Sequence, residues 1–145
     1  GVHVHEYGDL SDREKGTATG PHYNPYDEIH GCYPGDRKVG DMGNVVVNSR
    51  GEGVYVEVAN FLMRLRGDSS VIGRGAIFHA DEDNCVREEG PGGDLSAGAR
   101  SAQCVIALVA PDAALEKRAL AALRAANGDG VSYSKSGNVT RTFVR

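Results

Sequence analysis

The sequence predicts a predominantly β protein with one helix near its C-terminal end. Short apolar or alternating runs are separated by turn residues, and glycine is high, at 20 of 145 residues. Alternation with period two is typical of strands, because successive side chains point to opposite faces of a sheet. Apolar residues at helical spacing occur only in residues 111–126. The length is that of one domain.

The composition excludes two broad classes of function. The net charge is −4, so the chain as a whole has no attraction for nucleic acid. No run of about 18 apolar residues is present, so the sequence predicts no membrane span. The chain begins at Gly1 rather than Met and shows no charged and then apolar leader, from which we expect a processed or truncated chain.

The first 110 residues read as strands joined by two long loops. Residues 1–7 alternate, with His3 and His5 on one face, which predicts a strand. The polar stretch over residues 9–41 also holds His22 and His30, and a loop of this length in a compact domain is normally functional or disordered. Further along, we expect strands at 44–48, 53–59 and 70–79 and a short strand or turn at 61–66. A second loop is expected at 80–99. The last part of residues 100–110 is expected to be a buried strand.

The last 35 residues differ in character. Pro111 and Gly128 bound an Ala- and Leu-rich helix over residues 111–126. Residues 131–135 and 139–144 flank Ser136-Gly137-Asn138 and predict a hairpin. The apolar stripe of the helix indicates packing, for which a contact between subunits is slightly favoured over packing within the chain.

Three cysteines, Cys32, Cys85 and Cys104, fit either one disulfide and a spare thiol or three reduced thiols. A sequon, Asn138-Val139-Thr140, would be glycosylated at Asn138 only in a secreted protein. Together these features favour an extracellular location.

All five histidines fall at predicted strand ends or in the first long loop. Taken alone, His3 and His5 are more often two surface histidines, and His79 at the end of an apolar strand is more often structural. Their shared placement favours a metal site instead. Imidazole ligands suit copper or zinc better than calcium or magnesium.

Several motifs, in order, resemble the copper/zinc superoxide dismutase family. They cover about residues 1–110, leaving 111–145 as an extension. The matching segments are Gly1-Val2-His3-Val4-His5-Glu6-Tyr7-Gly8-Asp9, Gly20-Pro21-His22-Tyr23-Asn24-Pro25, His30-Gly31, Val39-Gly40-Asp41-Met42-Gly43-Asn44-Val45, Ile72-Gly73-Arg74, Asp83-Asn84 and, more loosely, Ala97-Gly98-Ala99-Arg100. The resemblance implies a Greek-key β-barrel or sandwich.

The resemblance also implies a role for each matched residue. His3, His5, His22 and His79 match the copper ligands, and His22, His30 and Asp41 match three zinc ligands, with His22 as the bridge. Asp83 matches the carboxylate that hydrogen-bonds one copper and one zinc histidine. Arg100 matches the guanidinium that attracts and positions the superoxide anion. The implied reaction is copper-dependent conversion of superoxide to oxygen and hydrogen peroxide, in which His22 also takes up a proton.

The sequence departs from the family in its zinc ligands and cysteines. Lys38 stands where the fourth zinc ligand is a histidine, and an ammonium is a poor zinc ligand, so zinc binding is an open question. The cysteines of the family disulfide fall at Gly16 and Gln103. Because Cys32 follows His30 and Cys85 follows Asp83 at the same interval, the resemblance predicts a replacement disulfide between Cys32 and Cys85, leaving Cys104 over.

The match begins at the fourth strand of the family's barrel. Because an open sheet edge is prone to association, we expect either a separate chain that supplies the missing strands, or strands from the C-terminal hairpin, or a homo-oligomer. The main functional alternative is a non-enzymatic extracellular protein for metal binding, transport or storage on the same fold. A third, less favoured alternative is the dismutase-like domain of a copper chaperone.

Overall fold

A computed structural model of the chain describes residues 1–53, 62–86, 97–108, 117, 121, 131–133 and 139–141. The chain divides into two compact units. Residues 1–45 and 57–108 make up the first, and residues 46–56 and 109–145 the second. The histidines and Arg100 belong to the first unit, which is the longer part of the chain.

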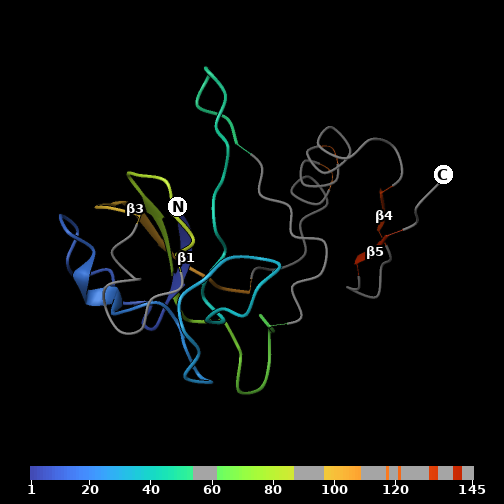
Figure 1. Cartoon of the computed structure of the whole chain (residues 1–145), viewed down its shortest axis with the longest axis horizontal. Coiled ribbons are helices and arrows are strands. Elements are labelled where there is room, and N and C mark those ends of the chain that lie inside the picture. Colours follow the sequence, from blue (N-terminus) through green and yellow to red (C-terminus); the bar gives the residue numbers. More distant parts are fainter. Residues whose placement is uncertain are drawn as a thin grey trace. The chain divides into compact units, whose positions relative to one another are not determined.

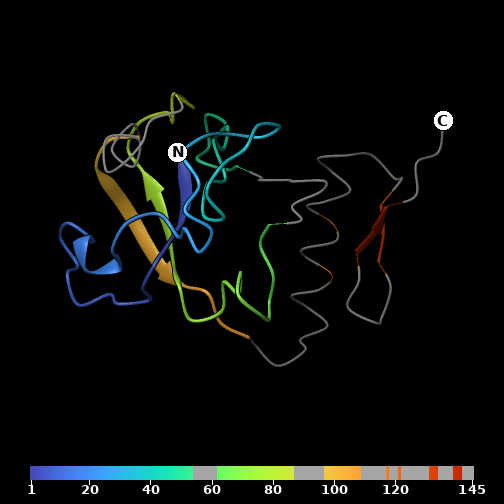
Figure 2. The ribbon, with the colours of Figure 1, turned by 60° about the horizontal axis from the view of Figure 1, so that its bottom comes forward.

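The first unit is built on a three-stranded antiparallel sheet in the order β1-β2-β3. Strand β1 spans Val2–His5, β2 spans Gly75–His79 and β3 spans Arg100–Val105 (Figure 1). In Figure 2 the blue β1, the yellow-green β2 and the orange β3 lie side by side. The register pairs His3 with Ile77 and His79 with Arg100, so candidate site residues from three distant segments meet on one sheet.

The first long loop returns to β1 twice. His22 forms an isolated antiparallel bridge with His5, and Asp41 forms one with His3. Gly40 lies between these segments, where a Cβ would clash with Val4 O, so the close approach requires glycine. This loop contains one 3₁₀ turn, η1, at Thr17–Thr19. Pairing with β1 therefore fixes the positions of His22 and Asp41, two of the loop residues for which a metal-binding role is predicted.

A small apolar core lies beneath the loop. Val4, Tyr23, Val39 and Val71 form it. The guanidinium carbon of Arg74 lies 3.3 Å from the centroid of the Tyr23 ring, and the Tyr23 hydroxyl donates to Asp68 O. A cation over an aromatic face stabilises such contacts. Tyr23 follows His22 directly, so this packing also fixes the position of His22.

Three expected strands differ in the structure. Strand β2 begins at Gly75 rather than at residue 70, because residues 71–74 form a turn with Gly73 at φ +81°. Residues 44–48 form no regular strand, and only Val47 pairs, with Gly53. The prediction of a buried strand in the last part of residues 100–110 is wrong. Strand β3 ends at Val105, and both Cys104 and Val105 are exposed. The reason is that β3 lies at the edge of the described sheet.

The second unit contains the predicted hairpin. Strands β4 (Val131–Tyr133) and β5 (Val139–Arg141) pair with each other in a two-stranded sheet, and the hypothesis that the hairpin supplies strands to the first sheet stays a prediction. Most of the expected helix over 111–126 lies outside the described residues, as does Asn138 of the sequon. Among the described residues, no helix is long and apolar enough to cross a membrane.

Candidate metal centre

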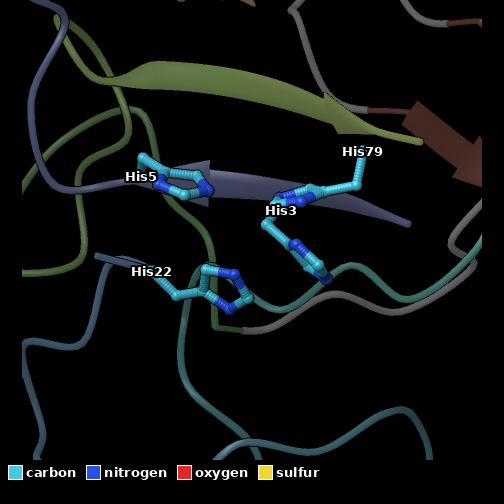
Figure 3. A group of neighbouring side chains, drawn as sticks. All are labelled: His3, His5, His22 and His79. Atoms are coloured by element: carbon cyan, nitrogen blue, oxygen red, sulfur yellow. The ribbon is translucent and has the colours of Figure 1, made fainter. Parts of the chain in front are cut away.

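Four imidazole rings converge at the sheet. His3 and His5 come from β1, His79 from the end of β2, and His22 from the loop segment beside β1 (Figure 3). Each offers one ring nitrogen to a group whose atoms all lie within 4.8 Å of one another. The rings of His3 and His22 are closest, with centroids 3.9 Å apart. All four residues predicted as copper ligands are thus brought together.

Hydrogen bonds determine which nitrogen each ring presents. His5 Nδ1 donates to Gly20 O at 2.7 Å, and His79 Nδ1 donates to Gly98 O at 3.0 Å. A carbonyl only accepts, so the proton of each neutral ring is on Nδ1 and the lone pair is on Nε2. His3 is held the other way round, because its Nε2 bonds Asp83 Oδ2 at 2.6 Å.

The inward nitrogens fit a metal ion. His3 Nδ1, His5 Nε2 and His79 Nε2 are buried and make no hydrogen bond within the described structure, and His22 Nε2 is buried with them. Buried nitrogens with lone pairs directed at a common point are costly without a ligand. An all-imidazole set suits copper, and the residues present therefore fit that ion.

A second group adjoins the first through His22. His22 Nδ1 lies 2.8 Å and His30 Nδ1 lies 3.2 Å from the same oxygen, Asp41 Oδ1. The other oxygen, Asp41 Oδ2, accepts from the backbone N–H of Gly31 and of Lys38. These three ligands fit part of a zinc site, which takes four in its structural form. His22 belongs to both groups, as predicted for a bridging ligand.

Lys38 is the departure at this second group. It is buried, with 6% of its surface exposed, and its backbone N–H donates to the carboxylate of Asp41. The side chain predicted to replace the fourth zinc ligand is therefore enclosed beside the group, not directed into solvent. A protonated amine offers no lone pair to a metal.

Asp83 forms hydrogen bonds with a histidine of each group. Its Oδ2 bonds His3 of the four-histidine group, called the copper group below, and its Oδ1 lies 3.0 Å from His30 Nε2 of the second group. The side chain of Asn44 holds Asp83 in place by bonding its backbone N–H and C=O, each at 2.8 Å. Such outer carboxylates orient metal-binding imidazoles and fix their tautomers.

Burial and charge set the protonation of these rings. Burial lowers the pKa of His3 to about 4 and that of His5 to about 2, and it also lowers the pKa of His79. These rings are neutral near pH 7, as metal ligation requires. Burial acts in the same direction on His30, but hydrogen bonds to Asp41 and Asp83 outweigh it and raise the pKa to about 9.

Arg100 is held beside the copper group by the first loop. Its Nη1 donates to Gly16 O at 2.6 Å and to Thr19 Oγ1 at 2.9 Å, and its Nη2 donates to Gly20 O at 2.9 Å. Gly20 O also accepts from His5, so one carbonyl connects the guanidinium with a predicted copper ligand. The positive charge of Arg100 therefore lies close enough to His5 to contribute to the lowering of its pKa, of which burial is the largest cause.

The structure forms the disulfide that the resemblance predicted. Cys32 and Cys85 are bonded, with Cα atoms 5.2 Å apart, and Cys104 has a free thiol. Cys85 N also donates to Asp83 Oδ1, so the bond ties the segment after His30 to the segment that positions Asp83. The prediction of this pairing is confirmed.

The model of the family described as copper/zinc superoxide dismutase matches residues 1–106. The chain belongs to the copper/zinc superoxide dismutase family. This membership supports the predicted all-β class and Greek-key barrel fold for the part of the chain that the family model matches. It also implies copper and zinc as metals, in agreement with the two groups of buried ligands.

The chain is similar to two proteins named superoxide dismutase and to a further protein of solved structure. An extracellular superoxide dismutase [Cu-Zn] of Brugia pahangi is 38% identical over 76% of this chain and 57% of its own length. A superoxide dismutase [Cu-Zn] of Yarrowia lipolytica is 39% identical over 76% of the chain and 71% of its own. A solved structure described as the clock protein EA4 is 33% identical, covers 75% of the chain and 69% of its own, and has a TM-score of 0.63. The chain thus spans from just over half to about 70% of the length of these proteins.

Some supporting residues were not predicted from the sequence. Asn44 bonds Asp83, Gln103 Nε2 donates to Asp12 O at 2.8 Å, and the carbonyls of Gly20 and Gly98 orient two histidines. Backbone acceptors leave no signal in a sequence. Asn44 and Gln103 are polar residues within apolar or strand-like segments, and this placement could have indicated a structural role. Their hydrogen-bond partners are distant in sequence and could not be predicted from it.

Proposed function

We propose that this protein is a copper-dependent superoxide dismutase that converts superoxide to oxygen and hydrogen peroxide. The observation that carries the proposal is the set of four buried imidazoles with their lone pairs directed inward, with Arg100 beside them. Bound copper would supply the one-electron redox chemistry. Membership of the dismutase family supports this reading.

The protein's own residues would bind the ion, guide the substrate and handle a proton. Hydrogen bonds to Asp83, Gly20 and Gly98 hold His3, His5 and His79 in one tautomer each, so the pocket is preorganised. Arg100 would attract and orient the superoxide anion despite the net charge of −4, because the local field decides the approach of a small anion. His22 Nε2 faces the copper group and would hold a proton when it does not bind the metal.

The second group would take zinc through His22, His30 and Asp41, with Lys38 in place of a fourth ligand. Three ligands and an adjacent buried lysine support weaker zinc binding than a four-ligand site gives. In the metal-free protein the raised pKa of His30 keeps a positive charge between Asp41 and Asp83. The charge that zinc would provide there is thus partly supplied by the protein.

The alternative function is metal binding, transport or storage without catalysis. The enclosed Lys38 favours this alternative, because it leaves the second site with three ligands while the four copper ligands are intact. Extracellular location is supported by the disulfide and by a relative named as extracellular. Asn138 would then be a glycosylation site, which intact-mass measurement of protein from a eukaryotic secretory host would test.

Association with a second copy, or with a chain that supplies further strands, is supported by two observations: β3 lies at the edge of the sheet formed by the described residues, and its Cys104 and Val105 are exposed. Light scattering coupled to size-exclusion chromatography would test it. A monomer at all concentrations would contradict this association.

One experiment separates the two functions. The purified protein is loaded with copper, its copper and zinc contents are measured, and superoxide decay is followed by pulse radiolysis. We expect decay catalysed in proportion to bound copper, and a loss of roughly tenfold or more in Arg100→Gln at equal copper content and low ionic strength. Full copper occupancy with no catalysed decay would contradict dismutation and favour storage or transport.

A further inference from the structure

Two side chains of β3 hold the first loop, and they do so from one face of the sheet. Arg100 bonds Gly16 O and Gly20 O, and Gln103 Nε2 donates to Asp12 O at 2.8 Å. Residues three apart in a regular strand point to opposite faces. A bulge resolves this, because Phe78 pairs with Ala102 and His79 pairs with Arg100, which leaves Ser101 as the extra residue. Arg100 and Gln103 therefore point the same way.

The segment that they hold is a compact turn closed by Asp12. The carboxylate of Asp12 accepts from the N–H groups of Lys15 and Thr17 and from the Thr17 hydroxyl. The carbonyl of Asp12 accepts from Gly16 N. These bonds hold the pKa of Asp12 at about 2, led by the bond from the Thr17 hydroxyl, so the carboxylate stays ionised near neutrality. Anchoring Asp12 O therefore anchors residues 12–20 as a unit.

The hydrogen bond from Gln103 to Asp12, called the anchor below, lies where related proteins are expected to have a disulfide. The family's tethering cysteines correspond to Gly16 and Gln103, and in this structure Gly16 has φ +65° and packs on Arg100, where a Cβ would lie 3.3 Å from Arg100 Cδ. The disulfide of this chain lies elsewhere, between Cys32 and Cys85. The segment facing the copper group and the segment facing the second group thus have separate tethers, one of hydrogen bonds and one covalent.

We propose that Gln103 is a positioning residue for Arg100, which it acts on by anchoring residues 12–20 to β3, and that this anchor is independent of the Cys32–Cys85 disulfide. The acceptors of Arg100 named above, two backbone carbonyls and the Thr19 hydroxyl, all belong to residues 16–20, so the position of its guanidinium depends on the position of this loop. His5 depends on the same Gly20 carbonyl. That Gln103 anchors the loop concerns the fold alone. That this anchor affects anion binding rests on the proposed function of Arg100.

Hydrogen exchange of the metal-free protein tests the anchor. Four proteins are compared: the unaltered chain, Gln103→Met, Ser101→Ala as an exposed neighbour on β3, and the double variant Cys32→Ser/Cys85→Ser. Loss of one hydrogen bond predicts roughly 2- to 10-fold faster exchange at the amides of Gly16, Thr19 and Gly20 in Gln103→Met. We expect little change in Ser101→Ala. In the double cysteine variant we expect faster exchange in residues 30–44 but not in residues 12–20.

Azide binding to the copper-loaded protein tests the consequence for Arg100. We expect a roughly 3- to 10-fold weaker azide affinity in Gln103→Met and an unchanged affinity in Ser101→Ala. Unchanged exchange in Gln103→Met would overturn the anchor, and faster exchange with unchanged azide affinity would overturn the positioning of Arg100. Faster exchange of residues 12–20 in the cysteine variant would overturn the independence of the two tethers. If Gln103→Met does not fold, Gln103→Asn, shortened by one methylene, makes the same test.

These outcomes are separable from a failure of the proposed function. If the unaltered chain does not catalyse superoxide decay with full copper, the exchange measurements still decide the anchor, because they use the metal-free protein. The azide measurements likewise require bound copper but not turnover.

Discussion

Asp83 Oδ2 lies 2.6 Å from His3 Nε2, while Asp83 Oδ1 lies 3.0 Å from His30 Nε2. One carboxylate therefore bonds an imidazole of each metal-binding group. The bond to His3 leaves Nδ1 directed at the copper group, and the bond to His30 leaves Nδ1 directed at Asp41. The two groups share an outer residue as well as the ring of His22, so a change at Asp83 should affect both.

Asp83→Asn should weaken copper binding by roughly 10- to 100-fold, the usual effect of removing an outer carboxylate partner of a metal-binding histidine. The amide has the size of the carboxylate but lacks its charge, and one of its two bonds must invert donor and acceptor. Competition against a chelator of known copper affinity measures the change. Asp81→Asn is the control, since Asp81 is exposed and two residues away. Equal copper affinities in the two variants would refute the role of Asp83.

The Cys32–Cys85 disulfide should contribute substantially to stability. It closes a loop with a sequence separation of 53 residues, for which chain entropy predicts about 4 kcal/mol in favour of the folded state. Replacement of both cysteines by serine should lower the free energy of unfolding by an amount of that order, as measured by urea denaturation of the metal-free protein. Cys104→Ser is the control, because Cys104 is an exposed free thiol and its change should cost little.

Lys38→His should increase zinc affinity by roughly tenfold or more, because it adds a neutral nitrogen ligand and removes a positive charge from the buried residue whose backbone N–H donates to Asp41. Zinc competition titrations monitored by a chromophoric chelator measure the change. Lys15→His is the matched control on an exposed lysine of the same loop. If Lys38→His and Lys15→His bind zinc equally, Lys38 does not limit the second site.

The sequence predicted the ligand set better than the strands that carry it. His3, His5, His22 and His79 are spread over 77 positions, and only the ordered family motifs connect them, yet the structure brings all four together. The Cys32–Cys85 pair was predictable for the same reason, through the contact between His30 and Asp83. These predictions succeeded because motif order carries long-range information that periodicity does not.

Periodicity failed where tertiary context decides burial. The apolar run Cys104-Val105-Ile106-Ala107-Leu108-Val109 reads as a buried strand, but β3 ends at Val105 and has a neighbouring strand only on the β2 side of the described sheet. Residues 70–79 read as one strand, but Gly73 turns the chain first. The bulge at Ser101, which turns Gln103 toward Asp12, depends on strand register, and no local pattern specifies register.

The stability of the metal-free protein should be greatest near pH 7, where the opposing contributions of three histidines and His30 balance. His3, His5 and His79 have lowered pKa values in the folded state, so below pH 6.5 the unfolded chain binds protons that the folded chain does not. Stability therefore falls as the pH is lowered from 6.5 toward 4. His30 has the opposite shift, to about 9, so its contribution is complete below 6.5 and is lost as the pH rises through 9.

Each proton changes the free energy of unfolding by at most ~1.4 kcal/mol per pH unit. Three histidines act on the acid side, whereas on the alkaline side the loss from His30 is opposed by the Gly1 ammonium, whose pKa is lowered by burial, so the acid slope should be the steeper. Urea denaturation at intervals from pH 5 to 9 measures both slopes, and His30→Gln should remove the alkaline one while leaving the acid one. A stability that rises steadily from pH 6.5 to 9 in the unaltered, metal-free protein would show that His30 is not protonated between Asp41 and Asp83.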